Sequence, residues 1–330
     1  MTTMLMKDVL PAWTPGTPVG HRNLTLVPLR GEGHQQRFQD YMLACEAIEA
    51  ELLKITEVDE SGSVPELLAV NDADRPVLLI DGEELQGAKQ NRILNTSVLL
   101  PPKSKKRIPV SCVEEGRWSQ VSPTFRAGNY APSSLRQRKS RDVQHSLRAR
   151  GRAESDQGAV WDSVAEQIEA HAAQSPTRAM SDAMGTLGEA LERYRDAFPY
   201  PSGACGVVAA VCGRFVAMDT FDSPSTLEAI WSRLVASYAM DAETTPDKTQ
   251  KHFTAKAAGV LVAHVSEQSC QAFSAVGLGD DLRFEAADVL GQALRADRHL
   301  LHLSVFPPSS NQPDIQNPGL SISPPSRRRR

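Results

Sequence analysis

The sequence predicts an α+β protein: a β-rich N-terminal part, folded as a sandwich or a partly open barrel, followed by a mixed helix and strand part. Two observations predict this fold class. Residues 19–121 contain short apolar segments separated by turn residues, a pattern typical of sandwiches and barrels. Residues 155–306 contain helical apolar stripes and strands without a regular βαβ alternation, which indicates α+β rather than α/β.

The β-rich part begins with a strand candidate at Leu24–Leu29. Residues Tyr41–Leu53 are predicted to form a helix, because apolar residues recur there at helical spacing. Strand candidates bounded by turn residues follow. They are Leu53–Val58, Pro65–Val70, Pro76–Ile80, Ile93–Leu100 and Arg107–Val113.

Residues 122–154 interrupt this pattern. The segment is polar, shows little periodicity and is rich in arginine. We therefore predict a basic linker or long loop between two domains.

The second part is predicted to begin with a helix that contains Val160 and Ile168 and ends before Pro176. Ser175 and Pro176 suit the N-cap and first position of the next helix, whose apolar stripe continues to Phe198. A β-hairpin is expected after Gly203, with strands at Val207–Val211 and Phe215–Phe221.

Two more helices and three strands complete the second part. Ser223 and Pro224 are predicted to cap the third helix, and a fourth is expected over Pro246–Phe273. The final strand candidates are Leu282–Ala286, Val289–Ala296 and His299–Phe306.

The length of 330 residues predicts about two domains, at roughly 150 residues each. We assign residues 19–121 to a β-rich domain and residues 155–306 to a helical and β-hairpin domain. Residues 1–18 are expected to be a flexible N-terminus. Residues 307–330 are rich in proline and serine and end in four arginines, so we predict a disordered tail.

Composition restricts the classes of partner. The net charge of −4 argues against general binding to nucleic acid, although the basic tail could contact it. No apolar run approaches the ~20 residues that span a bilayer, so we expect no membrane partner. The five cysteines include no Cys-x-x-Cys pair, and a reducing cytoplasm fits this usage best.

The densest polar segment is residues 81–92, directly after an apolar strand. Its glycines, Gly82 and Gly87, allow tight turns and close approach of the backbone to a ligand. Lys89 and Arg92 could hold a phosphate or carboxylate. The neighbouring amides Gln90 and Asn91 could contact a base edge or a sugar.

Two glutamates of this segment, Glu83 and Glu84, are candidates for a general base. Adjacent residues of a strand point to opposite faces, so at most one of them would serve a given site. An alternative without a ligand remains open, in which Glu84 pairs with Lys89 or Arg92 to join two strands.

A second dense stretch spans residues 108–118. Glu114 is a further candidate base, and Arg117 and Trp118 could lie at the edge of a binding site. Cys112 has no histidine neighbour in the sequence, so a buried structural thiol is favoured over a nucleophile.

Together these two stretches resemble the ARPP-1 family, the ARG and rhodanese-phosphatase-superfamily-associated protein domain. The resemblance is carried by Gly82–Glu84, Gly87–Arg92, Ile108–Glu114 and Gly116–Trp118, and it covers most of residues 20–306. The family name implies association with ADP-ribosylglycohydrolase and rhodanese-phosphatase proteins, and hence a setting in NAD or ADP-ribose metabolism. It implies no particular reaction.

The sequence contains no Walker loop, dinucleotide-binding glycine motif, nucleophile elbow or His-Glu-x-x-His motif, so we expect neither a metal nor a cofactor. Three hypotheses remain. The protein recognises an ADP-ribose-like or other phosphorylated nucleotide; it is a hydrolase or transferase that uses the same site; or it is a non-catalytic protein that docks a partner enzyme through the basic residues 122–152.

Overall fold

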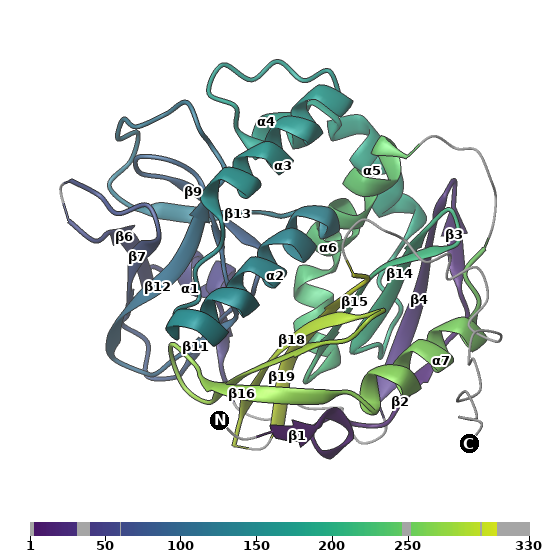
Figure 1. Cartoon of the computed structure of the whole chain (residues 1–330). Coiled ribbons are helices and arrows are strands. Elements are labelled where there is room, and N and C mark those ends of the chain that lie inside the picture. Colours follow the sequence, from purple (N-terminus) through teal and green to yellow (C-terminus); the bar gives the residue numbers. More distant parts are fainter. Residues whose placement is uncertain (1–2, 32–39, 60, 246–251, 298, 309–330) are drawn as a thin grey trace, which may run out of the picture.

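The structure is a computed structural model that describes residues 3–31, 40–59, 61–245, 252–297 and 299–308. Three β-sheets and seven α-helices are described there. Figure 1 shows the largest sheet on one side of the molecule, the smaller sheets on the other, and helix α2 (Ser133–Arg150) between them. The fold is α+β, as predicted.

The largest sheet has ten strands and joins both ends of the described chain. Its order is β1-β16-β17-β18-β19-β15-β14-β4-β2, with β3 paired to β4, and every neighbouring pair is antiparallel. The strands are β1 (Thr3–Leu5), β2 (Trp13–Pro15), β3 (Val19–His21), β4 (Leu24–Gly31), β14 (Gly206–Val211), β15 (Arg214–Phe221), β16 (Ser269–Ser274), β17 (Asp280–Glu285), β18 (Leu290–Ala296) and β19 (His299–Phe306).

The second sheet curls into a half-barrel with the order β13-β9-β10-β12-β7-β6. A small sheet, β11-β8-β5, lies beside it, followed in the chain after β5 by helix α1 (Ala44–Glu49). The strands are β5 (Met42–Leu43), β6 (Leu53–Glu57), β7 (Glu66–Asn71), β8 (Val77–Leu79), β9 (Glu83–Gly87), β10 (Arg92–Leu94), β11 (Val98–Leu100), β12 (Ser104–Cys112) and β13 (Phe125–Tyr130).

Helices cover both faces of the large sheet. Helix α6 (Pro224–Thr244) starts at the Ser223 N-cap, whose side chain accepts the backbone N–H of Thr226, with Pro224 at its first position. The remaining helices are the 3₁₀ turn η1 (Met6–Asp8), α3 (Gln157–Ala170), α4 (Met180–Thr186), α5 (Gly188–Ala197) and α7 (Ala255–Ser266).

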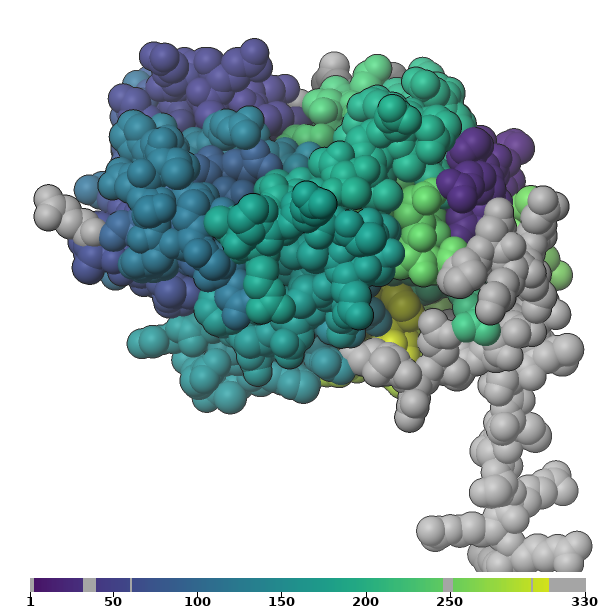
Figure 2. Space-filling model, turned by 90° about the horizontal axis from the view of Figure 1, so that it is seen from above, coloured from purple at the N-terminus to yellow at the C-terminus, as the bar shows by residue number. Residues whose placement is uncertain are grey.

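The main hydrophobic core contains side chains from both parts of the chain. Ile93 of β10 and Val113, directly after β12, belong to the same buried cluster as Leu191, Leu227 and Leu294. Seen from above, the blue surface of the half-barrel region lies directly against the teal surface that includes residues 157–197 (Figure 2). Burial of this shared apolar surface is the main force that holds the two parts together.

Most predicted elements are confirmed. The predicted hairpin is present as β14 and β15, the cap of α6 is correct, and the last three strands match β17–β19. The predicted segment Ile93–Leu100 is instead two strands, β10 and β11, of different sheets.

The largest difference concerns residues 122–154, predicted as a linker or loop. They form β13 and the 18-residue helix α2. The prediction was wrong because Arg136 and Lys139 lie on the buried face of α2, where an apolar stripe would be expected. Whether the two parts are separate domains stays a prediction.

Other boundaries also differ. Residues 3–15, expected to be flexible, form β1, η1 and β2, because β1 pairs with β16 and β2 with β4. The helix expected at Ser175 begins at Met180, where the Ser175 hydroxyl accepts the backbone N–H of Ala179 at 2.7 Å. Of the helix predicted over 246–273, residues 255–266 are helical as α7, 269–274 form β16, and 246–251 lie outside the described residues.

The residues of the predicted tail from 309 onward also lie outside the described residues. Within the described part of the chain, every helix is too short or too polar to cross a membrane.

Candidate functional site

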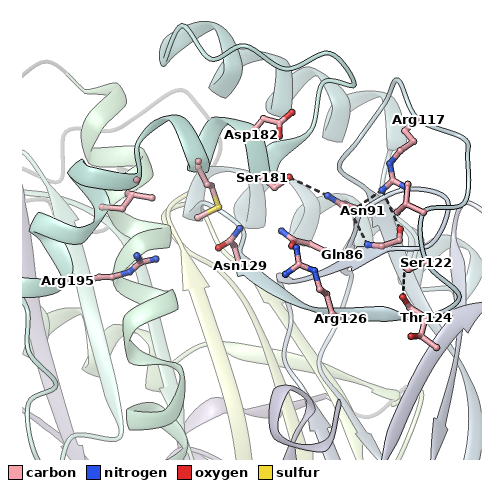
Figure 3. Close-up of a pocket in the computed structure, with 16 residues that line it drawn as sticks. Gln86, Asn91, Arg117, Ser122, Thr124, Arg126, Asn129, Ser181, Asp182 and Arg195 are labelled. Atoms are coloured by element: carbon pink, nitrogen blue, oxygen red, sulfur yellow. Dashed lines mark hydrogen bonds between the residues drawn. The ribbon is translucent and has the colours of Figure 1, made fainter. Parts of the chain in front are cut away.

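A pocket of about 800 Å³ lies between the outer strands of the half-barrel, the loop of residues 114–124, and helices α4 and α5. Figure 3 shows its polar side chains pointing into the same space from these elements. The lining residues include Gln86, Asn91, Asn129, Ser122, Thr124, Ser181, Asp182, Arg117, Arg126 and Arg195.

Strand β9 forms the floor of this pocket. Because side chains alternate along a strand, Glu84 and Gln86 face the pocket side and Glu83 faces away. Glu83 instead forms an ion pair of 3.1 Å with Arg233 of α6. Of the two adjacent glutamates, Glu84 is therefore the one placed at the pocket.

Glu84 is buried just beneath the floor, with 1% of its surface exposed. Its Oε2 atom accepts hydrogen bonds from Gln86 Nε2 at 2.7 Å and from the backbone and side-chain nitrogens of Asn129, both at 3.2 Å. Its Oε1 atom is buried without a partner among the described residues. Burial raises the pKa of this carboxyl against the effect of those hydrogen bonds.

An irregularity in the pairing of β13 with β9 brings Asn129 into contact with Glu84. The register between β13 and β9 shifts between Ala127 and Tyr130, so Asn129 turns its amide toward Glu84. Gly128 leaves the necessary space, since a Cβ atom there would lie 2.8 Å from Glu84 Oε2 and from Gln86 Cγ. The bulge and the glycine together create the amide-lined floor.

The far wall is fixed by Glu114 and Arg117. The Arg117 guanidinium donates to both oxygens of Glu114, at 2.7 and 2.5 Å, and Glu114 also accepts from the Asn91 backbone and from Thr177. Burial opposes ionisation of Glu114, but these donors outweigh it and lower its pKa. Glu114 is therefore held in its ionised form by these donors, and a carboxylate with a lowered pKa is a poor general base.

The three pocket arginines differ in how their charge is balanced. Arg117 is neutralised by Glu114, and Arg195 by Glu192, which lies three residues earlier on α5. The guanidinium of Arg126 has neither a hydrogen bond nor an ion pair to any residue that the structure describes. Arg126 thus has the least compensated charge of the three.

Four predicted binding residues point elsewhere. Gln90 and Arg92 are buried and do not line the pocket, and Arg92 Nη1 donates to Gln90 Oε1 at 3.0 Å. Lys89 and Arg92 both lie against the ring of Trp118, at 5.5 and 5.7 Å from its centre. Burial lowers the pKa of Arg92, and its Nε and Nη2 atoms have no partner in the described structure.

The alternative in which Glu84 pairs with Lys89 or Arg92 is not what the structure shows, since Glu84 bonds to Gln86 and Asn129. Gly82 and Gly87 both have positive φ, at 82° and 128°, which L side chains rarely adopt. Gly87 lines the pocket, whereas Gly82 packs against Arg136.

Cys112 is buried, and burial raises the pKa of its thiol, consistent with a structural role. Within the described ranges, no group of three or more metal-ligating side chains comes together.

Sequence reasoning missed Arg126, Asn129, Ser181, Asp182 and Arg195. These residues lie in segments interpreted as a linker or as the apolar stripe of a helix. The pair Gly128-Asn129 within a short strand was the available signal, because a glycine in a strand often marks a bulge or a close approach.

The model of the ARG and Rhodanese-Phosphatase-superfamily-associated Protein domain matches residues 13–306, which include all of the pocket residues. Neither the curated proteins nor the solved structures contain a match to the chain. This chain belongs to the ARPP-1 family.

Proposed function

We propose that this protein recognises an ADP-ribose-like or other phosphorylated nucleotide in the pocket above Glu84. The observation that carries the proposal is the joint presence of an uncompensated guanidinium, that of Arg126, and amide groups on the neighbouring floor. Arginine is suited to bind phosphate, and amides are suited to a base or sugar.

The size and polarity of the pocket agree with such a ligand. Its volume of about 800 Å³ falls within the range of typical small-molecule sites. Apolar side chains, including Met184 and Leu191, line part of it and offer a surface for a ring. The family description names ARG among the associated proteins, which supports a setting in ADP-ribose metabolism.

A hydrolase or transferase activity is the second candidate, and one observation favours it. Glu84 is a buried carboxyl with a raised pKa at the pocket floor, a property common among catalytic acids and bases. Of the three predicted catalytic residues, Glu83 and Glu114 are held in ion pairs. A catalytic role for Glu84 predicts that Glu84→Gln binds nucleotide but forms no product.

The docking hypothesis receives less support. In the basic segment, Arg136 is fully buried, and Arg138 and Arg148 are paired with Glu166 and Glu285. Fewer charges are therefore free for a partner than the sequence indicates.

Calorimetric titration with ADP-ribose, NAD, AMP and inorganic phosphate tests the proposal. We expect at least one of the nucleotides to bind, and Arg126→Ala to weaken that binding by roughly tenfold, since hydrogen bonds to charged groups contribute about 1.5–3 kcal/mol. Arg193→Ala is the matched control, because Arg193 is an exposed arginine of α5 that does not line the pocket. Binding that is absent, or unchanged in Arg126→Ala, would contradict the proposal.

A further inference from the structure

Two amide side chains on the pocket floor share a single hydrogen-bond acceptor. Gln86 Nε2 and Asn129 Nδ2 both donate to Glu84 Oε2, and the backbone N–H of Asn129 donates to the same atom. Figure 3 shows Gln86 and Asn129 next to each other on the floor, with Arg126 beside Gln86.

The chemistry of Glu84 fixes which end of each amide faces it. A carboxylate oxygen only accepts hydrogen bonds, and Oε2 remains an acceptor if a proton resides on Oε1. Flipping either amide would place its carbonyl oxygen against Oε2 and lose a hydrogen bond to a buried group, which is costly. The –NH₂ ends of both amides must therefore face Glu84.

The carbonyl ends are then the parts available to a ligand. Neither Gln86 Oε1 nor Asn129 Oδ1 accepts a hydrogen bond from the described residues, and both side chains line the pocket. Asn91 differs, because its oxygen already accepts from the Gly87 backbone and from Arg117, and its nitrogen donates to Ser181. The floor thus presents two adjacent acceptors.

We propose that the pocket selects ligands that carry a primary carboxamide or an amino group, whose N–H bonds donate to Gln86 Oε1 and Asn129 Oδ1. Glu84 is a positioning residue that orients both amides. The inference rests on the proposed function, and it adds the chemical group by which one nucleotide is distinguished from another. Arg126 is opposite Gln86 in the β13–β9 register, so a phosphate on the same ligand would lie within reach of a cation.

Among groups of similar shape, a carboxylate should bind this floor most weakly in place of the carboxamide. A carboxylate has no donor to offer to the two carbonyl oxygens, and its charge would approach the carboxyl of Glu84. Sites that hydrogen-bond a polar group reject analogues that lack it, because their own buried groups lose their partners.

The test compares nicotinamide mononucleotide with nicotinic acid mononucleotide, which differ in this one group. We expect the carboxamide to bind at least about tenfold more tightly to the wild-type protein, corresponding to one net hydrogen bond. Equal binding, or tighter binding of the acid, would overturn this inference and leave the proposed function standing. If the protein bound neither these two probes nor the nucleotides above, the proposed function itself would fail.

Two variants of Glu84 distinguish its role in orienting the two amides from the effect of its negative charge. In Glu84→Gln, the new –NH₂ group can occupy the place of the unpartnered Oε1 while the carbonyl keeps the place of Oε2, so the preference should persist. In Glu84→Leu the acceptor is lost, both amides are free to flip, and the preference should fall toward unity. Loss of the preference in Glu84→Gln, or its retention in Glu84→Leu, would overturn the positioning role.

Glu189→Gln is the control, because Glu189 is fully exposed on α5. Should Glu84→Leu fail to fold, Gln86→Met removes one of the two acceptors directly. We expect this variant to lose most of the preference while it still binds inorganic phosphate as the wild type does. An unchanged preference in Gln86→Met would contradict the proposal.

Discussion

Two buried polar clusters of this protein differ in how their charges are balanced. Around α2, Arg136 forms a two-point ion pair with Asp219, at 2.8 and 3.1 Å, and Lys139 pairs with Asp81. Beneath the pocket, Glu84 is equally buried but has no cationic partner among the described residues, and its bonds are to amides.

The difference separates a cluster that supports the fold from one that can serve a ligand. An ion pair in which each charge faces its opposite leaves little to offer to a ligand. A carboxyl that orients two amides leaves their other ends available. In this protein, whether a buried charged group has a partner of opposite charge is therefore a better guide to a candidate ligand site than the density of polar residues in the sequence.

The largest expected effect is on stability, from Arg136→Met. Removing the guanidinium leaves Asp219 buried without its guanidinium partner, although Tyr238 and Ser304 still donate to it, and loss of such a partner typically costs about 3–5 kcal/mol. Urea unfolding measures the change. Arg138→Met, on the exposed face of the same helix, should change the free energy of unfolding by no more than ~0.5 kcal/mol. Equal effects of the two variants would contradict a stabilising role for the buried Arg136–Asp219 ion pair.

The second expected effect is that Asp219 and Glu84 change the pH dependence of the free energy of unfolding in opposite directions. Although burial opposes it, the Arg136 guanidinium holds the pKa of Asp219 well below its usual range. Asp219 then binds fewer protons in the folded state, so its stabilisation is present above about pH 3.9 and is lost as the pH falls below it.

Glu84 behaves in the opposite sense, because burial raises its pKa in the folded state. Its contribution to stability is complete below about pH 4.3 and is lost as the pH rises through the raised value. Unfolding measured from pH 2 to 8 should therefore lose part of its slope below about pH 3.9 in Asp219→Asn and part of its opposing slope in Glu84→Gln. Slopes of the same sign for both carboxyls would disagree with the structure.

A smaller effect is expected for Gly128→Ala. The added methyl group would lie 2.8 Å from Glu84 Oε2 and displace the floor, so we expect nucleotide binding to weaken about tenfold with a stability loss of about 1–2 kcal/mol. Gly259→Ala is the control, since Gly259 lies in α7, does not line the pocket, and a Cβ atom there meets only Pro15 Cγ at 3.7 Å, while alanine favours the helix by up to ~1 kcal/mol. Calorimetry and thermal unfolding would reveal whether the two substitutions differ in this way.

The smallest effect is expected for Trp118→Ala. Trp118 is 49% exposed, its ring lies against Lys89 and Arg92, and none of the three residues lines the pocket. Loss of the stacking should cost about 0.5–1 kcal/mol of stability and leave nucleotide binding unchanged. A clear loss of nucleotide binding would mean that Trp118 contributes to the ligand site although it does not line this pocket.

The sequence predicted the strands and helices best where apolar periodicity is regular, as in β14, β15 and α6. It failed for α2, because the buried face of this helix carries Arg136 and Lys139, whose partners are distant in sequence. The polar density of residues 81–92 predicted Glu84 as a candidate site residue. The hydrogen-bond partner of Glu84, Asn129, was not predicted. A register shift in β13 brings the two residues together, and no periodicity in the sequence indicates this shift.

The large sheet also has a consequence for synthesis on the ribosome. Strand β4, which is mostly apolar, pairs with β2 and β3 near it in sequence but also needs β14, and β1 needs β16. At roughly 5–20 residues per second, the nascent chain carries one unpaired edge of β4 for on the order of ten seconds before β14 emerges. An apolar strand edge exposed for that time invites aggregation, so production of this protein should depend strongly on chaperones that shield nascent chains.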